Sequence, residues 1–526
     1  MTLQNIGGLA LGDFRDRVRR PVYAVTLLAA VILGYLAVPG TGSTWAIMNI
    51  GGYRGVYDSA YVGTAAALAA ALWLTLGGFY VVRGAIGHDE RTGVGRLVAA
   101  TPLRTPAYLA AKFLSNLMVL GSMVGVLAAT AAVMQFARAE DRAIDPVALL
   151  VPFVVIALPM AAATAAAALL FETLPVLRGG IGNVGWFFVW LTVAVGGLSE
   201  RAPVDVLGVQ HVVEALRATM IDQGLWKPRS SFSLGLTQEP EPLESFPWDG
   251  FPLAAGFLGG RALVVLAALA VALLPALWFA RFDPARGGFR RTSEQAPTAE
   301  LELPPAPAYR GLPATAPVYG NTFGRLLAGE LTIIAREATR WWWLGAAALA
   351  AVGLAVPIGS VAPVVLPLAW VWPVLLWSRL GTRHQRDGME GLIGAYPAPH
   401  RRLLAEWTAG LAVTALLGLA PLARMAASGD RPGMAAWLGG ALLIPSLALA
   451  AGTLTRTPRL FQAVYPALWY CAFNGLAPLD FMGAARTDGT PAGPHPLAVT
   501  ALGGLLLVLT LLTTSARGSA WTTRHV

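Results

Sequence analysis

Few residues of this 526-residue chain have the types and spacing that catalysis, metal binding or nucleotide binding requires. A P-loop needs a lysine followed by serine or threonine, and the two lysines, Lys112 and Lys227, are followed by Phe113 and Pro228. Cys471 is the single cysteine, which excludes intrachain disulfides and cysteine-based metal clusters. Neither a His-Glu metal motif nor a Gly-x-Ser-x-Gly elbow occurs. The sequence therefore predicts no enzyme activity and no bound metal or cofactor in this chain.

Two related loops, at 88–106 and 384–402, have the composition of surfaces that a soluble partner grips. Each runs from a charged stretch through glycine into a short segment with apolar residues at helical spacing, which a proline then ends. A shift of 295 residues superposes the second loop on the first. The matched pairs are Arg91 with Arg386, Gly93 with Gly388, Leu97 with Leu392, Ala100 with Ala395, Pro102 with Pro397 and Leu109 with Leu404.

These loops carry the predicted docking residues. A short helix with a partly apolar face at the membrane surface offers a partner both contact area and a connection to the adjoining spans. A plain basic loop is the alternative, but retention of the pattern in both halves disfavours it. The predicted docking residues are Arg91, Gly93, Arg96, Leu97, Thr101 and Pro102 in the first loop, and Arg386, Gly388, Leu392, Tyr396 and Pro397 in the second.

The elements that position both loops are apolar stretches long enough to cross a membrane. Hydrophobic residues make up 56% and charged residues 13% of the chain, whereas soluble domains carry about 25% charged residues. A bilayer core needs roughly 20 apolar residues per helix. We place spans near 22–38, 61–82, 107–134, 147–170, 184–198, 252–280, 341–357, 361–378, 403–423, 434–452, 462–479 and 495–515. The predicted fold is an all-α polytopic membrane protein with about twelve transmembrane helices.

The distribution of arginine orients the chain. With twelve spans, the basic clusters before the first span, in both related loops, in the connector between the halves and near the end all fall on one side, which is typical of the cytoplasm. The acidic loop at 199–251 falls on the other side. We predict a multi-pass inner (plasma) membrane protein with cytoplasmic N- and C-termini. Because the arginines are scattered over loops, the net charge of +9 does not predict nucleic-acid binding.

Two comparable halves make up the chain. We expect a first six-helix half at 1–280, a proline-rich cytoplasmic linker at 281–324 and a second six-helix half at 325–526. The halves also match upstream of the loops at a different shift, which places an insertion in the Gly- and Tyr-rich segment at 40–60. Because matching loops lie on the same side, the repeats are predicted to be parallel rather than inverted.

The first loop resembles a known family of membrane proteins. Its sequence from His88 to Leu103, HDERTGVGRLVAATPL, followed by Tyr108-Leu109 and Lys112-Phe113, resembles the coupling helix of type-2 permeases of ATP-binding-cassette exporters, which share their fold with the G- and A-subfamily transporters. The second copy departs from this pattern, with Tyr396 in place of Thr101. The resemblance implies an elbow helix before each half, at 13–20 and 325–340, and places the largest external loop between the fifth and sixth spans. In the second elbow we expect one apolar face, made by Leu327, Leu331 and Ile334, with Glu330 elsewhere.

The resemblance implies a transport subunit that is driven from outside this chain. ATP and Mg would bind to a separate ATP-binding-cassette ATPase subunit, in two copies, docked on the two coupling loops. The direction would be export. Spans almost free of charge suit a hydrophobic or amphipathic small-molecule cargo, such as a drug, an antibiotic or a lipid. The residues that line the substrate path are not assigned from the sequence, because nearly every helix face is apolar.

The alternative is a proton-coupled secondary efflux carrier of the major facilitator type, which also has parallel six-helix halves. Such carriers need ionisable groups inside the membrane, and the predicted spans have almost none. Arg261, Glu172 and Arg424 fall near span ends, where we expect their charged groups to snorkel toward water.

Overall fold

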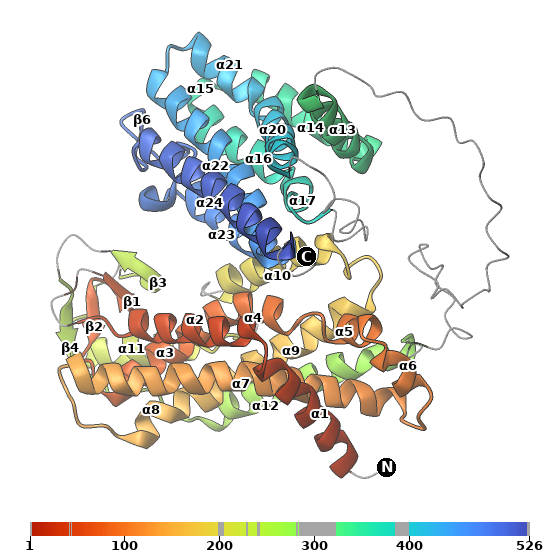
Figure 1. Ribbon diagram of the computed structural model, residues 1–526. Coiled ribbons are helices and arrows are strands. Elements are labelled where there is room, and N and C mark those ends of the chain that lie inside the picture. The colour runs from red at the N-terminus through yellow and green to blue at the C-terminus, as the bar shows by residue number, and fades with distance from the viewer. Residues whose placement is uncertain are drawn as a thin grey trace. The chain divides into compact units, whose positions relative to one another are not determined.

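The chain divides into two compact units, Met1–Arg290 and Arg291–Val526, and each is described by itself (Figure 1). The structure is a computed structural model. It describes residues 3–40, 43, 45–197, 205–227, 230–238, 242–279, 282, 322–383 and 399–522. Most of the predicted linker at 281–324 and most of the second related loop therefore lie outside the described residues.

The first unit is a bundle of apolar helices preceded by the shorter helix α1 (Leu3–Val18). Two of its rods contain a π-helical turn, η1 or η2, between two α-helical pieces. In chain order the bundle consists of α2 (Pro21–Ala37), α3 (Ser59–Ala69) with η1 (Ala70–Leu74) and α4 (Thr75–Val82), α7 (Thr105–Arg138), α8 (Pro146–Pro152) with η2 (Phe153–Ala157) and α9 (Leu158–Thr173), α10 (Gly180–Gly197), and α12 (Ala255–Leu273) with η3 (Leu274–Leu277).

Small residues inside and large apolar residues outside mark this bundle as a lipid-facing structure. Nearly every residue of α3 is buried, most of them alanine, glycine or threonine. A Cβ on Gly63 would lie 2.5 Å from the carbonyl oxygen of Leu149, so α3 and α8 approach at backbone distance. By contrast, Leu263 and Leu266 of α12 are 64% and 62% exposed. Large exposed leucines around a core of small residues are the arrangement expected where lipid is the solvent.

A small sheet closes one end of the first unit. Its order is β3-β1-β2-β4, formed by β1 (Trp45–Ile50), β2 (Tyr53–Gly55), β3 (Phe232–Gln238) and β4 (Glu244–Phe246). β1 is antiparallel to β2 and β3, and β2 is parallel to β4. The sheet thus joins the 40–60 segment to the 199–251 loop, so these two loops lie at one end of the bundle, as expected of loops on one side of the membrane. The prediction of an all-α protein did not include this sheet.

The amphipathic helix α11 (Val209–Asp222) packs at the same end. Val212, Leu216 and Met220 follow helical spacing and are buried against the cluster that contains Tyr61 and Trp248. At the opposite end of the bundle lie two short helices, α5 (Ala85–Arg91) and α6 (Val94–Ala99), as Figure 1 shows.

The second unit has more broken helices. It begins with α13 (Thr322–Glu337), and a hairpin of β5 (Arg486–Thr487) and β6 (Thr490–Pro491) precedes its last helix. After α13 come α14 (Arg340–Ala355), α15 (Ile358–Ser360) with η4 (Val361–Val365) and α16 (Leu366–Val371), α17 (Val374–Trp377), α20 (Pro399–Leu417), α21 (Leu419–Ala427), α22 (Arg431–Thr455), α23 (Arg459–Phe473), η5 (Ala477–Leu479) and α24 (Pro496–Thr522).

The described residues contain seven helices long and apolar enough to cross a membrane, or up to nine if each of two bent pairs forms one span. This confirms a helical, membrane-embedded protein, while the twelve spans and the two repeats stay predictions. The difference lies mainly in the second unit, where α14 and α23 have 16 and 15 residues. The single span expected at 361–378 is interrupted before Pro373, because the apolar helix there covers only Ile358–Val371 and proline lacks the N–H that continues an α-helix.

Candidate functional site

Two glycines shape the first related loop. Gly84 ends the second apolar rod with φ of 102°, and Gly93 separates α5 from α6 with φ of 76°. Only glycine adopts such angles without steric cost, so these two positions allow α4, α5 and α6 to follow one another as separate helices. The short helix predicted before Pro102 is α6, which has six residues.

The predicted docking residues of this loop lie on its outer surface. Arg91, Arg96, Thr101 and Pro102 are exposed, and Leu97 is 70% exposed. The apolar side chain of Val94, 40% exposed, adds to this surface. We call Arg91, Val94, Arg96, Leu97 and Thr101 the α6 surface. It combines cationic and apolar groups that the rest of the described first unit leaves exposed.

The inner side of α6 is packed. Val98 is buried. A Cβ on Gly95 would lie 2.9 Å from the Phe282 ring, and that ring also meets Tyr108 edge to face at 5.9 Å between centroids. Gly93, the remaining predicted residue of this loop, is the hinge between the helices. The α6 surface is therefore backed by fixed side chains.

Glu172, at the end of α9, caps the N-terminus of α5. Its carboxylate accepts hydrogen bonds from the N–H groups of Gly84, Ala85 (3.1 Å), Ile86 (2.8 Å) and Gly87 (3.4 Å). The first turn of a helix has free N–H groups and a partial positive charge, so a buried carboxylate is stabilised there. The prediction that Glu172 snorkels is therefore wrong.

The other two residues expected to snorkel also cap backbone. Arg261 is buried and donates to the carbonyls of Asp205 and Val206. Arg424 donates to the carbonyls of Leu354 (2.6 Å) and Val356 (2.8 Å) at the end of α14. The sequence shows that these residues lie near span ends. It does not show that their side chains contact backbone carbonyls dozens of residues away in the chain.

A buried ion network joins α1, α5 and α7. The ammonium of Lys112 on α7 lies 2.9 Å from Asp13 on α1 and 2.9 Å from Asp89 on α5. Tyr108 donates to Asp89 (2.7 Å), and Arg17 pairs with Asp13 (2.9 Å). We call these five residues the Lys112 network. Its two carboxylates are balanced by two cations, which is the condition under which buried charges are tolerated.

The charges of the network affect the pKa of Asp13. Burial alone would raise the pKa of this carboxyl, but the charges of Arg17 and Lys112 and the hydrogen bond from Ser115 outweigh it and leave the pKa below its usual value. Asp13 is therefore ionised at neutral pH.

Arg83 ties the same region to α10. Its buried guanidinium donates to the side-chain oxygen of Asn183 and to the carbonyls of Leu177 and Gly179. Together with Glu172 and the Lys112 network, Arg83 connects the loop to helices α1, α7, α9 and α10. Sequence reasoning missed these connections, although a lysine inside an apolar span was a signal that could have pointed to Lys112.

The second related loop is described only at its edges. The predicted residues Arg386, Gly388, Leu392, Tyr396 and Pro397 lie outside the described residues. Just before them, Gly381 has φ of 74° and donates its N–H to Glu406 (2.6 Å), while Arg383 pairs with Glu330 on α13 (2.9 Å). An acid of the elbow helix thus pairs with a cation beside the loop in each unit.

The face predicted for the second elbow needs a correction. Ile334 is buried as expected, but Leu331 is 37% exposed and Glu330 is buried with Ile334. The ion pair with Arg383 explains the difference, because it draws the carboxylate of Glu330 to the packed side of α13.

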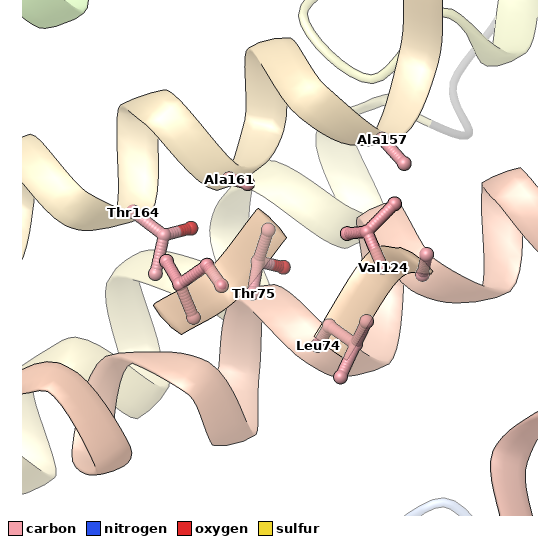
Figure 2. A pocket seen from close by; sticks show the side chains of 8 residues that line it. Leu74, Thr75, Val124, Ala157, Ala161 and Thr164 are labelled. Atoms are coloured by element: carbon pink, nitrogen blue, oxygen red, sulfur yellow. The ribbon is translucent and has the colours of Figure 1, made fainter. Parts of the chain in front are cut away.

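A small hollow of about 10 Å³ lies where η1 and α4 meet α7, η2 and α9 (Figure 2). Ligand pockets typically enclose about 300–1,000 Å³, so the hollow is smaller than a drug-sized ligand requires. Thr75 and Thr164 line it among apolar side chains. Among the described residues no three His, Cys, Asp or Glu side chains come together as metal ligands.

Comparison with known proteins gives no further assignment: no family model, no curated protein and no solved structure matches the chain.

Proposed function

We propose that this chain is the permease subunit of a type-2 ATP-binding-cassette exporter. In this function the α6 surface is the coupling site for a separate ATPase subunit, and the chain moves a hydrophobic or amphipathic compound outward. The observation that carries the proposal is an exposed cationic and apolar surface on a short helix that is anchored, on its inner side, to several membrane helices.

The anchoring meets a mechanical requirement of such a subunit. A partner that changes shape on ATP hydrolysis has to move helices in the membrane, so its contact point needs stiff connections to them. Lys112 and Asp89 connect the loop to α7, and Glu172 connects it to α9. Buried charged contacts resist separation, since breaking one leaves an unpaired charge. A push on α6 would therefore displace several helices together.

The ends of the first unit support an orientation. Arginine-rich segments lie at the end with α5 and α6, and the sheet with its acidic loop lies at the other. By the positive-inside rule the α6 end faces the cytoplasm, where ATP is present. We infer cytoplasmic termini, a position in the inner (plasma) membrane and twelve spans in two parallel halves of six.

The proposal requires ATP and Mg to bind elsewhere. Because this chain lacks a P-loop lysine, two copies of an ATPase subunit would supply hydrolysis, one at each related loop. The chain itself would not be an enzyme.

Charge reversal of the α6 surface tests the proposal. The tagged chain is purified from gently solubilised native membranes, and co-purifying proteins are identified by mass spectrometry, together with ATP hydrolysis. We expect a P-loop subunit in stoichiometric amount, and at least a tenfold loss of it with Arg91→Glu and Arg96→Glu combined. Arg142→Glu reverses an exposed arginine at the sheet end and serves as the matched control, which should retain the partner.

One observation favours the alternative, a proton-coupled carrier. Glu406 lies inside the predicted span at 403–423, is fully buried, and its Oε2 has no hydrogen-bond partner in the described part of the chain. A buried carboxyl of this kind suits proton transfer in a membrane. If the purified chain alone transports cargo on a proton gradient, and Glu406→Gln abolishes that transport, the exporter proposal is overturned.

A further inference from the structure

The second apolar rod of the first unit contains a π-helical turn at its centre. α3 passes through η1, Ala70–Leu74, into α4 without a break in the chain direction. A π-helical turn holds one residue more than an α-helical turn would, and such turns are rare and concentrate at functional positions. The described residues contain two others, η2 and η4.

Proline accounts for the other two π-helical turns. η2 lies between Pro152 and Pro159, and η4 contains Pro363 and is followed two residues later by Pro367. A proline inside a helix removes one hydrogen bond and its ring collides with the preceding turn, so a wider turn relieves the clash. η1, with the sequence Ala-Ala-Leu-Trp-Leu, has no proline in or beside it. Its width is therefore not fixed by covalent structure.

Side-chain donors hold η1 open instead. The indole N–H of Trp190 on α10 donates to the carbonyl of Leu72 (2.6 Å). The hydroxyl of Thr75 donates to the carbonyls of Ala71 (2.5 Å) and Leu72 (3.0 Å). A carbonyl oxygen can accept two hydrogen bonds, and these two side chains bond carbonyls inside the π-helical turn.

A small gap in the packing lies beside η1. Ala70, Leu74 and Thr75 line this hollow of about 10 Å³, room for about one water molecule, and Figure 2 shows Leu74, Thr75, Ala161 and Thr164 around it. Close packing elsewhere in a helical core resists rotation of a helix. At this position the packing is interrupted next to the turn that would have to move.

We propose that η1 is a register switch that converts between a π-helical and an α-helical turn, and that the Trp190 indole selects the π-helical form. When the turn becomes α-helical, its extra residue takes a regular helical position. This rotates α4 relative to α3 by about 100° and shifts it by about 1.5 Å along the axis. Because α4 leads directly through Arg83 into α5 and α6, this rotation is carried to the α6 surface. That last consequence rests on the proposed function, whereas the switch itself does not.

The second unit has a similar arrangement of side-chain donors, but its π-helical turn is not free to convert. Trp469 on α23 donates to the carbonyl of Pro367 (2.8 Å), and Tyr465 donates to that of Trp370 (2.7 Å). Leu72 and Pro367 are separated by 295 residues, the same shift that superposes the two related loops. Since prolines fix the turn in the second unit, we assign the switch to the first unit alone.

Distances between two nitroxide labels test the switch in the full chain without cargo or partner. Cys471→Ser provides a cysteine-free background. One label is placed at Gly77→Cys on α4, where a side chain meets open space, and the other at Val133→Cys on α7, which is 59% exposed. The labelled protein is reconstituted in lipid nanodiscs, and the distance distribution is measured by pulsed electron paramagnetic resonance.

Trp190→Phe removes the indole donor and keeps an aromatic ring. We expect a second distance population, displaced by several ångströms and comprising at least a fifth of the molecules. Trp186→Phe is the matched control, one turn earlier on α10, because its indole nitrogen is buried without a partner among the described residues. The control should keep the parent distribution.

A second pair of variants distinguishes loss of a hydrogen bond to η1 from a change in packing around Trp190. Thr75→Val removes the hydroxyl that bonds η1 and should produce the same new population. Thr164→Val removes a hydroxyl that bonds Met160 (2.8 Å) in α9, across the hollow, and should not. An unchanged distribution in both Trp190→Phe and Thr75→Val, or equal changes in the controls, overturns the switch. Because no ATPase is present, this outcome is independent of whether the proposed partner exists.

Discussion

At the scale of single residues, the charges buried in the first unit are the most sensitive positions. Lys112 is 2% exposed and lies within hydrogen-bonding distance of two carboxylates. Removal of its charge leaves Asp13 and Asp89 close together with less compensation, and such losses cost about 3–5 kcal/mol.

We therefore expect Lys112→Met to lower the midpoint of thermal unfolding in detergent by several degrees. The matched control is Lys227→Met, because Lys227 is exposed, and exposed substitutions change stability by about 0.5 kcal/mol or less. Equal midpoints for the two variants would show that the Lys112 network does not stabilise the unit.

A second prediction at this scale concerns pH at the sheet end. Arg54 donates to both oxygens of Glu140 (2.9 and 2.7 Å), and the N–H of Tyr57 donates to the same carboxylate (3.0 Å). The hydrogen bond from Arg54 lowers the pKa of Glu140, against the opposing effect of burial. A lowered pKa means that the pair stabilises the fold above the ordinary glutamate pKa and loses this contribution as pH falls through the lowered value.

Glu140→Gln should accordingly destabilise the sheet end by about 1 kcal/mol at pH 7, a modest value because Glu140 is partly exposed. The difference from the parent should shrink as the pH falls below the ordinary glutamate pKa and vanish once the pH lies below the lowered pKa of Glu140. Protection factors of the β1 and β3 amides in hydrogen exchange, compared between parent and variant at each pH, measure it. A difference that does not shrink as the pH falls would assign the effect to packing rather than charge.

At the scale of elements, hydropathy located the helices well and their interruptions poorly. The long apolar runs at 107–134 and 147–170 correspond to α7 and to α8 through α9. The run at 403–423 is instead a pair, α20 and α21, bent by 56°. Gly418 lies at this bend, and a Cβ there would come 2.5 Å from the indole nitrogen of Trp437. Such a contact depends on tertiary packing, which a hydropathy profile does not contain.

The candidate site was predictable on its outer face only. The exposure of Arg91, Arg96 and Leu97 follows from local sequence, because charged residues at helical spacing around glycines favour a surface loop. The anchors behind it come from far along the chain. Glu172 caps a helix more than 80 residues earlier, and Asp13 reaches Lys112 about 100 residues later. Sequence spacing carries no direct signal for such pairs.

At the scale of the whole molecule, the arrangement of loops predicts which ends are accessible from which side. In the Cys471→Ser background, a cysteine at Asp222, exposed at the sheet end, should react with a membrane-impermeant maleimide on intact cells. A cysteine at Thr101, exposed beside α6, should react only after permeabilisation. Labelling of both from outside would contradict the opposite placement of the two ends, and the reversed pattern would invert the orientation.

The sheet of the first unit also dictates an order of biogenesis. Met48 of β1 pairs with Leu234 of β3, so the ribosome has to synthesise almost 190 further residues, including four helical rods of the bundle, before the pairing partner emerges. At about 5–20 residues per second this interval is roughly 10–40 s. During that time the β1–β2 hairpin has unpaired edges, which are prone to aberrant association. The early hairpin therefore depends on shielding, by the nascent bundle or by a chaperone, until the late strands arrive to complete it.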